Sequence, residues 1–233
     1  AGLAAAGTEA PPLPSKADSA HAALWDLWRE PLPENLTRKD QAYWQHQDEH
    51  LRRFSAAARA FAAQFPSDPR RYDGLIQSSF TRPWFIAGFK PEFATRPGES
   101  TLIVDQVGLA AFRAGQIAAL SEVVQAPEAS ARQRGGAMHA LLIDLRAQAQ
   151  AAGETFDVSS VRALVDRVVS TFGDERAVPV VSQYLEALRK YSADAAQAYE
   201  AHLQTTPVAA VMREVAEKQR EASEKAAALQ RLR

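Results

Sequence analysis

The chain has 233 residues and no cysteine, and its 27 Lys and Arg residues nearly balance its 28 Asp and Glu residues, for a formal net charge of −1. The lack of cysteine excludes thiol catalysis, thiolate zinc sites and disulfides in this chain, and the near-zero charge leaves no overall basic field that would attract nucleic acid or an anionic membrane. Alanine and other strong helix formers dominate the composition, which favours a mainly helical chain.

Residues 1–17 are predicted to form a flexible N-terminal segment. They are mostly small, include prolines and carry few large apolar side chains, so they cannot bury enough surface to fold. The segment suits either the end of a signal peptide followed by a stalk or a trimmed boundary, and both interpretations stay open. No apolar run in the chain approaches the roughly 20 residues needed to cross a bilayer, so we expect no transmembrane segment.

Two helices are expected next. Ser19 can cap a short helix that carries Leu24, Trp25, Leu27 and Trp28. Thr37, with Asp40 three residues later, resembles a capping box and predicts the start of a long helix that ends at Phe65, before a proline. The apolar stripe of this long helix alternates by three and four residues, through Trp44, Gln47, Leu51, Phe54, Ala58, Phe61 and Phe65. Asp68 and Pro69 then suit the N-cap and first position of another helix, which predicts a helical hairpin.

One pattern on the long helix resembles a catalytic signature. His46-Gln47-Asp48-Glu49-His50 has the His-x-x-Glu-His order of inverted zinc peptidases, and Glu128 lies at a downstream distance that suits a further ligand. Such enzymes need both imidazoles on zinc and the glutamate beside the bound water. On a helix the two histidines flank the apolar stripe, whereas Glu49 points almost the opposite way. We therefore expect ordinary histidines at the edge of a buried face, with no metal or other cofactor.

The segment from Phe80 to Gly98 interrupts the helical pattern. It contains three prolines and two glycines, which break a long regular helix, and it is rich in aromatic residues. These aromatic residues either fold into the domain's own core or anchor a partner, because aromatic side chains on irregular segments often mark interfaces. Trp84, Phe85 and Phe89 are therefore the candidate partner-binding residues.

Helical periodicity resumes after this segment. Apolar stripes predict helices over residues 109–124, 138–145, 161–172, 181–191 and 195–203. Thr206 and Pro207 suit the start of a last helix, whose apolar side thins towards its end while i,i+4 charge pairs support it. No run alternates as a strand would. The sequence thus predicts an all-α fold without a sheet, either a multi-helix bundle or an irregular α-solenoid of helical hairpins. Its parts are the flexible segment 1–17, a helical domain 18–217 and a helical connector 218–233.

Two stretches carry a resemblance to a known family. AARAFAAQFPSDPRR and the C-terminal YEAHLQTTPVAAVMREVAEKQREASEKAAALQRLR resemble the helical region that precedes the thioredoxin-like domain in exported bacterial proteins of the TlpA-like group. In those proteins a helix ends in a Pro-Asp-Pro-type turn and a late helix leads into the redoxin domain. The resemblance covers roughly a third of this chain, and the Cys-x-x-Cys motif is absent, so no catalytic residue carries over.

The resemblance implies a non-catalytic accessory or protein-interaction module that is periplasmic or otherwise exported. Its partner would be a protein or an adjacent thioredoxin-like domain. Two alternatives of other classes stay open. One is a metal-dependent hydrolase that uses His46, Glu49 and His50, with Glu128 as a further ligand, and the other is a purely structural helical scaffold.

Overall fold

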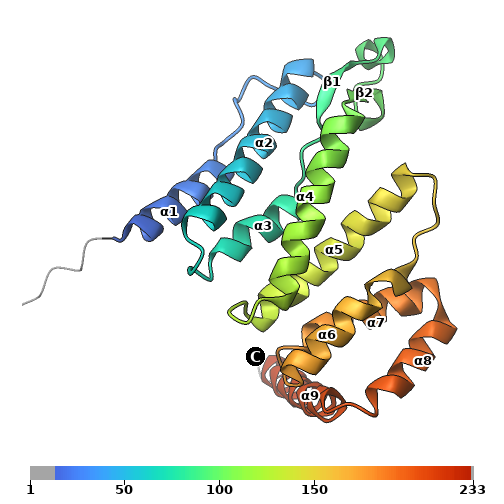
Figure 1. Ribbon diagram of the computed structural model, residues 1–233. Helices are drawn as coiled ribbons and strands as arrows, with labels where there is room; N and C mark the ends of the chain where they lie inside the picture. The colour runs from blue at the N-terminus through green and yellow to red at the C-terminus, as the bar shows by residue number, and fades with distance from the viewer. Residues whose placement is uncertain (1–13, 232–233) are drawn as a thin grey trace, which may run out of the picture.

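The structure, a computed structural model, describes residues 14–231, apart from the side chains at positions 228, 229 and 231. The expected flexible segment lies outside these residues except for its last four positions, and the last two residues of the expected connector also lie outside them. The α-helices of the described residues are α1 Lys16–Trp28, α2 Gln41–Gln64, α3 Arg71–Phe80, α4 Gln106–Gln125, α5 Ala131–Ala151, α6 Arg162–Phe172, α7 Val178–Tyr191, α8 Ala193–Leu203 and α9 Val208–Arg231 (Figure 1). The predicted all-α class is confirmed.

The expectation that there is no sheet is wrong at one place. Strands β1 Ile86–Phe89 and β2 Leu102–Val104 form a two-stranded antiparallel sheet, whose register shifts between Ile86 and Gly88. Two 3₁₀ turns, Pro91–Ala94 and Glu99–Thr101, connect the strands. Strands this short, one of them with an irregular register, leave no alternation in the sequence that could predict them.

Side-chain hydrogen bonds explain why two helices start away from the predicted positions. The N-cap of α1 is Ser15, four residues before Ser19, and it forms a complete capping box with Asp18. At α2, the carboxylate of Asp40 accepts hydrogen bonds from the backbone N–H and hydroxyl of Thr37, at 2.9 and 2.7 Å. These bonds close a turn ahead of the helix, so α2 starts at Gln41 rather than directly after Thr37.

The main core lies among α3 to α9, with α4 and α5 as an antiparallel hairpin at its centre (Figure 1). Arg134 on α5 is fully buried and donates hydrogen bonds to the carbonyl oxygens of Ala126 and Pro127 at the hairpin turn, while its guanidinium lies 4.1 Å from the centre of the Phe172 ring. At Gly135, a Cβ would lie only 2.7 Å from Cβ of Pro179, so α5 and α7 pack at a distance that requires glycine.

α4 is, by length and composition alone, apolar enough to cross a membrane, which the sequence analysis did not anticipate. Core helices of globular domains share this property. In the fold, α4 packs along α5 and contributes Leu120, Val123 and Val124 to the main core. It also carries a buried amide, Gln116, which donates to the hydroxyls of Ser78 and Ser79 and accepts from Arg59, so α4 is tied to α3 and α2 by hydrogen bonds.

α1 and α2 form a second, smaller core. Leu24 packs there against Phe54, Ala58 and Phe61 on the C-terminal half of α2. At Gly74 of α3, a Cβ would lie 3.0 Å from side-chain atoms of both Leu24 and Ala58, so three helices meet at this glycine. The N-terminal half of α2 is covered instead by the segment that carries the sheet, where Trp44 packs with Phe93 and Leu102.

Asp48 fixes that segment on α2. Its buried carboxylate accepts hydrogen bonds from the backbone N–H groups of Phe85 and Ile86, at 2.8 and 3.0 Å, and pairs with Arg52 at 2.8 Å. Phe85 adopts a left-handed backbone, with φ of 58°, which is costly for a bulky residue and persists only where the surroundings hold it. The guanidinium of Arg52 also covers the Phe85 ring, at 4.3 Å from its centre.

Replacing Asp48 with Ala should lower the free energy of unfolding by about 2–4 kcal/mol, because two backbone donors and one guanidinium lose their acceptor. Asp48→Asn keeps one acceptor oxygen and should lose less. Urea unfolding measures both effects. Glu49→Ala, which changes the exposed neighbour, is the control and should stay within about 0.5 kcal/mol of wild type. A loss at Asp48→Ala no larger than that of the control would contradict this account.

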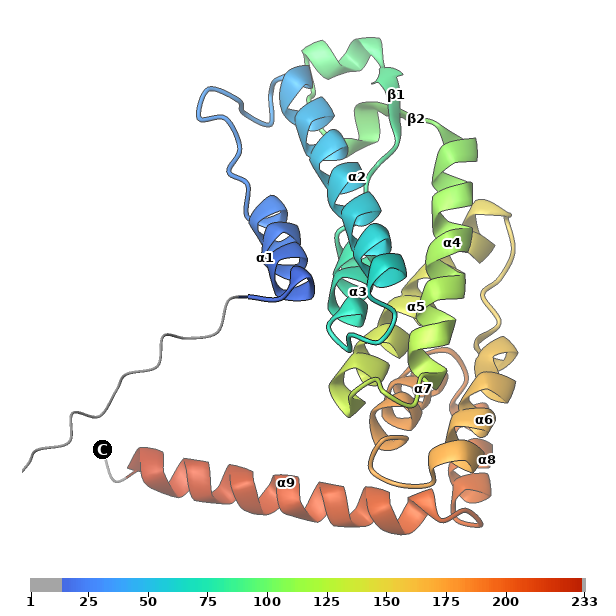
Figure 2. The same ribbon diagram turned by 60° about the vertical axis from the view of Figure 1, so that its left-hand side comes forward.

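The N-terminal end of α9 lies beside α8, and the rest of the helix extends past the other helices and away from them (Figure 2). Val208, Val211, Met212 and Val215 pack against the main core, whereas every side chain described from Ala216 onward is exposed. Glu214 and Lys218 form an ion pair at 2.6 Å. The last turns of α9 therefore depend on local interactions.

Amide hydrogen exchange on the isolated chain should show weak protection in α9 after Lys218, because few tertiary contacts oppose local opening there. Residues Val161–Phe172, which contribute Val165 and Val168 to the core, should exchange far more slowly and serve as the internal reference. Equal, strong protection of both segments in a monomer would rule out a connector.

Candidate interaction surface

The three aromatic residues singled out from the sequence are half-buried and packed within the chain. The Trp84 ring meets the Trp44 ring edge-on at 5.5 Å, and the Phe89 ring meets that of Phe93 at 4.9 Å. Phe85 lies against Phe112 of α4, with 5.4 Å between ring centres. These contacts support the first interpretation of the segment, that it folds into a small core. A role for its partly exposed faces in partner binding stays a prediction.

The residues of the metal-site alternative do not come together. His50 is buried, 8% exposed, with Nδ1 3.9 Å from the Glu30 carboxylate, while His46 is half-buried and Glu49 is exposed. Glu128 lies in the turn between α4 and α5 and is bound by the side chains of Arg71 and Tyr72. That turn is near the C-terminal end of α2 (Figure 1), whereas His46 belongs to the first turns of α2. Within residues 14–231, no three His, Asp or Glu side chains form a group that could hold a metal ion.

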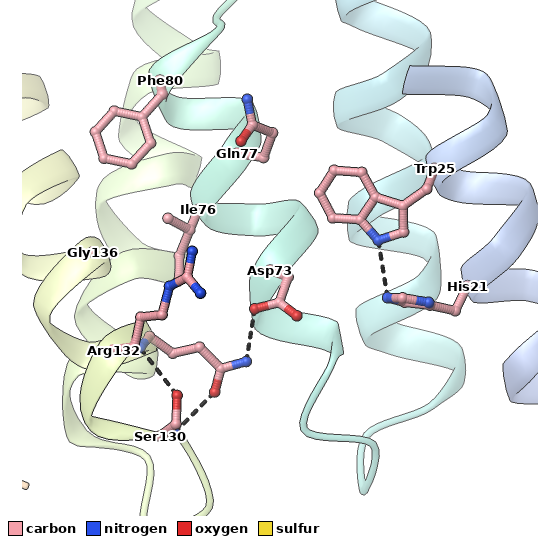
Figure 3. A pocket seen from close by; sticks show the side chains of 10 residues that line it. His21, Trp25, Asp73, Ile76, Gln77, Phe80, Ser130, Arg132 and Gly136 are labelled. Carbon is pink, nitrogen blue, oxygen red and sulfur yellow. Dashed lines mark hydrogen bonds between the residues drawn. The ribbon is translucent and has the colours of Figure 1, made fainter. Parts of the chain in front are cut away.

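A groove of about 660 Å³ lies between α1, α3 and the start of α5 (Figure 3). On the α1 side, the indole N–H of Trp25 donates to Nε2 of His21 at 2.9 Å. On the α3 side, Asp73 accepts from the Gln133 amide at 2.8 Å. Gln133 also completes the capping box of α5 with Ser130, so the helix terminus at this groove is already satisfied.

A second, smaller groove of about 130 Å³ continues between α5 and α7. Its apolar part comes from Ile143, Phe156 and Tyr191, and the last two rings meet edge-on at 5.6 Å. The grooves meet at His139, whose ring lies 5.6 Å from that of Phe80, which lines the first groove. Nδ1 of His139 also lies 3.0 Å from Oε1 of Gln183 on α7. One continuous surface therefore extends from α1 across α3 and α5 to α7.

This surface gathers exposed apolar side chains. Phe80, Ile143 and Tyr191, which are 45, 38 and 40% exposed, all line it. We call it the α5 face, and its members on α3, α5 and α7 are Ile76, Phe80, Arg132, Gly136, His139, Ile143, Arg146, Lys190 and Tyr191. Large apolar groups left in water forfeit burial energy, and a cluster of them typically marks a binding site.

Sequence reasoning missed the α5 face. It assigned the leucines around position 142 to a buried stripe and gave no role to His139. The signal that could have found the face is a second stripe on the same helix, Arg132, Gly136, His139, Ile143 and Arg146, spaced by four, three, four and three residues. One of the two stripes of this helix packs against the core, and the other is left for a further contact.

Comparisons with known proteins do not identify the chain. No model of a protein family matches the sequence, and no match was found among curated proteins or among solved structures.

His50 gives a prediction about pH. Burial lowers the pKa of His50 below its ordinary value of 6.5, and Arg53 and His46 add to this. The Glu30 carboxylate and a backbone hydrogen bond at Trp28 raise the pKa of His50 but do not cancel the effect of burial. At a pH between the lowered pKa and 6.5, His50 binds a proton in the unfolded chain but not in the folded chain. Stability should therefore fall as the pH drops through 6.5, and it should be unaffected by this group above that value.

Urea unfolding at about pH 7.5 and about pH 5.5 tests this prediction in wild type and in His50→Gln. The variant should lose less stability than wild type over this interval, because Gln takes up no proton. Equal losses would show that protonation of His50 is not coupled to folding.

Proposed function

We propose that this chain is a non-catalytic helical accessory module that binds a protein partner through the α5 face. The observation that carries the proposal is the presence of Phe80, Ile143 and Tyr191 on one continuous surface. Apolar anchors surrounded by polar groups are typical of protein–protein interfaces. This observation favours the α5 face over the aromatic segment as the partner surface, because the side chains of that segment pack against Trp44, Phe93 and Phe112.

The described ionisable groups fit structural roles better than catalytic ones. The side chain of Asp144 on α5 is 3% exposed, and burial raises its pKa despite the nearby guanidinium groups of Arg82 and Arg113. Arg82 donates to it at 3.0 Å, so the carboxylate ties α5 to the segment that follows α3. The acidic group of Asp166 likewise accepts from the buried Tyr199 hydroxyl at 2.9 Å. Both carboxylates join elements of the fold.

The exposed part of α9 supports a role beside another domain or subunit. Its apolar side chains pack near its start, and the rest of the helix stands free of the body. Together with the sequence resemblance to exported TlpA-like proteins, this arrangement suits an accessory region next to a thioredoxin-like domain. The partner would then be that domain or one of its clients, in an extracytoplasmic compartment.

A photo-crosslinking amino acid at position 143, in the full chain produced in its source cells, should give one discrete adduct. The same amino acid at position 118, an exposed alanine on α4, should give none. Phe80→Ser should weaken the adduct at least about fivefold, because truncation of an interface anchor typically costs more than 1 kcal/mol. Adducts of equal yield at both positions, or an adduct unaffected by Phe80→Ser, would overturn the proposal.

A further inference from the structure

We infer that the α5 face binds an acidic amphipathic helix of a protein partner. The inference rests on the proposed function and specifies the chemistry of the partner. Two features of the α5 face carry it, the spacing of its side chains and its charges.

The spacing favours a helix as the occupant. Arg132, Gly136, His139, Ile143 and Arg146 follow the four-three alternation by which a helix receives another helix in its grooves. The stripe runs over fifteen residues, Arg132 to Arg146, so its ends are about 21 Å apart at 1.5 Å per residue, which is about four helical turns. α3 contributes Ile76 and Phe80 on one side and α7 contributes Ala187 and Lys190 on the other, each pair at helical spacing.

A small residue in the N-terminal half of the stripe suits the same occupant. Gly136 lines the first groove and has no side chain, and the atom nearest to the place of its missing Cβ is on Ile76, 3.4 Å away. A partner helix can therefore approach α5 at this point until it meets Ile76. Phe80, which meets the His139 ring at 5.6 Å, and Ile143 both lie farther along α5, towards its C-terminal end. A helix with apolar side chains on one face can place them between these two groups and against Tyr191.

The charges favour acidic residues beside those apolar groups. Arg132 lies at one end of the α5 face, and Arg146 and Lys190 lie at the other end. None of these three side chains forms an ion pair with any residue that the structure describes. Arg146 and Lys190 flank the Tyr191 ring, with their charged groups 5.5 and 5.8 Å from its centre.

Two acidic residues also line the grooves. Asp73 is bound by the Gln133 amide, and Glu186 lies one helical turn before Lys190. The cations therefore outnumber the acids and occupy both ends of the surface. Carboxylates at the two ends of a bound helix would meet them, and charges at the rim of an interface set which partners are accepted.

The test uses a designed helical peptide of about 18 residues, with leucines at the positions that face α5 and glutamates beside them. Two control peptides have the same sequence except that lysines, in one, or glutamines, in the other, replace the glutamates. Binding of each to the full chain is measured by fluorescence anisotropy. The acidic peptide should bind at least about tenfold more tightly than the basic one, and added salt should narrow the difference.

Variants of the chain locate the effect. The double variant Arg146→Glu and Lys190→Glu should invert the preference, so that the basic peptide binds better. Lys39→Glu makes the same kind of charge change at an exposed position before α2 and should leave the preference unchanged. Ile143→Ser should weaken all three peptides if they occupy the α5 face.

Each remaining outcome overturns the inference. Equal affinity for the three peptides, weakened by Ile143→Ser, would mean that the face takes helices without regard to charge. Binding that neither Ile143→Ser nor the charge reversal affects would place the peptides elsewhere. No binding of any peptide would exclude a helical occupant. In all three cases the adduct at position 143 decides the proposed function separately, because that measurement depends on no designed peptide.

Discussion

The buried carboxylate of Asp48 holds the segment with β1 and β2 on the N-terminal half of α2. A carboxylate taken out of water must keep partners for its oxygens, and here two of them are backbone N–H groups of a segment almost forty residues away in the chain. This requirement dictates the path of the segment, including the left-handed backbone at Phe85. Once the segment is in place, its aromatic side chains cover Trp44 and give the N-terminal half of α2 a core of its own, which α1 does not supply because it packs on the other half.

Other buried polar groups act in a similar way at the joints between helices. Gln116 links α4 to two serines of α3 and to Arg59 of α2, and Arg134 binds the carbonyl oxygens of the turn that precedes its own helix. Such groups are costly to bury unless they are paired, so they specify one arrangement of apolar surfaces that could otherwise slide. The apolar stripes bring these helices together, and the polar joints select the geometry.

Local chemistry explains which parts of the structure were predictable from the sequence. Helices such as α6 and α7 follow from apolar periodicity alone, since their stripes fill the main core. The strands are too short to leave a pattern, and the start of α1 depends on Ser15, which the prediction had assigned to the flexible segment.

The pattern around His46 drew attention to metal ligands, whereas the residue between the histidines that matters most to the fold is Asp48. Apart from Arg52, its partners are backbone groups, which no sequence pattern reveals. The α5 face depends on how three helices converge, so it too was invisible until they were packed.

The free part of α9 has a consequence for anything joined to it. A helix advances about 1.5 Å and turns about 100° with each residue, so α9 sets both the distance and the direction of a following element. One residue inserted after Val215 would rotate that element by about 100° around the helix axis while moving it hardly at all, whereas seven inserted residues would restore its orientation almost completely, about 10 Å farther away. The exposed side chains tolerate changes in composition, but for any element joined after it the number of residues in this helix would be under a geometric constraint.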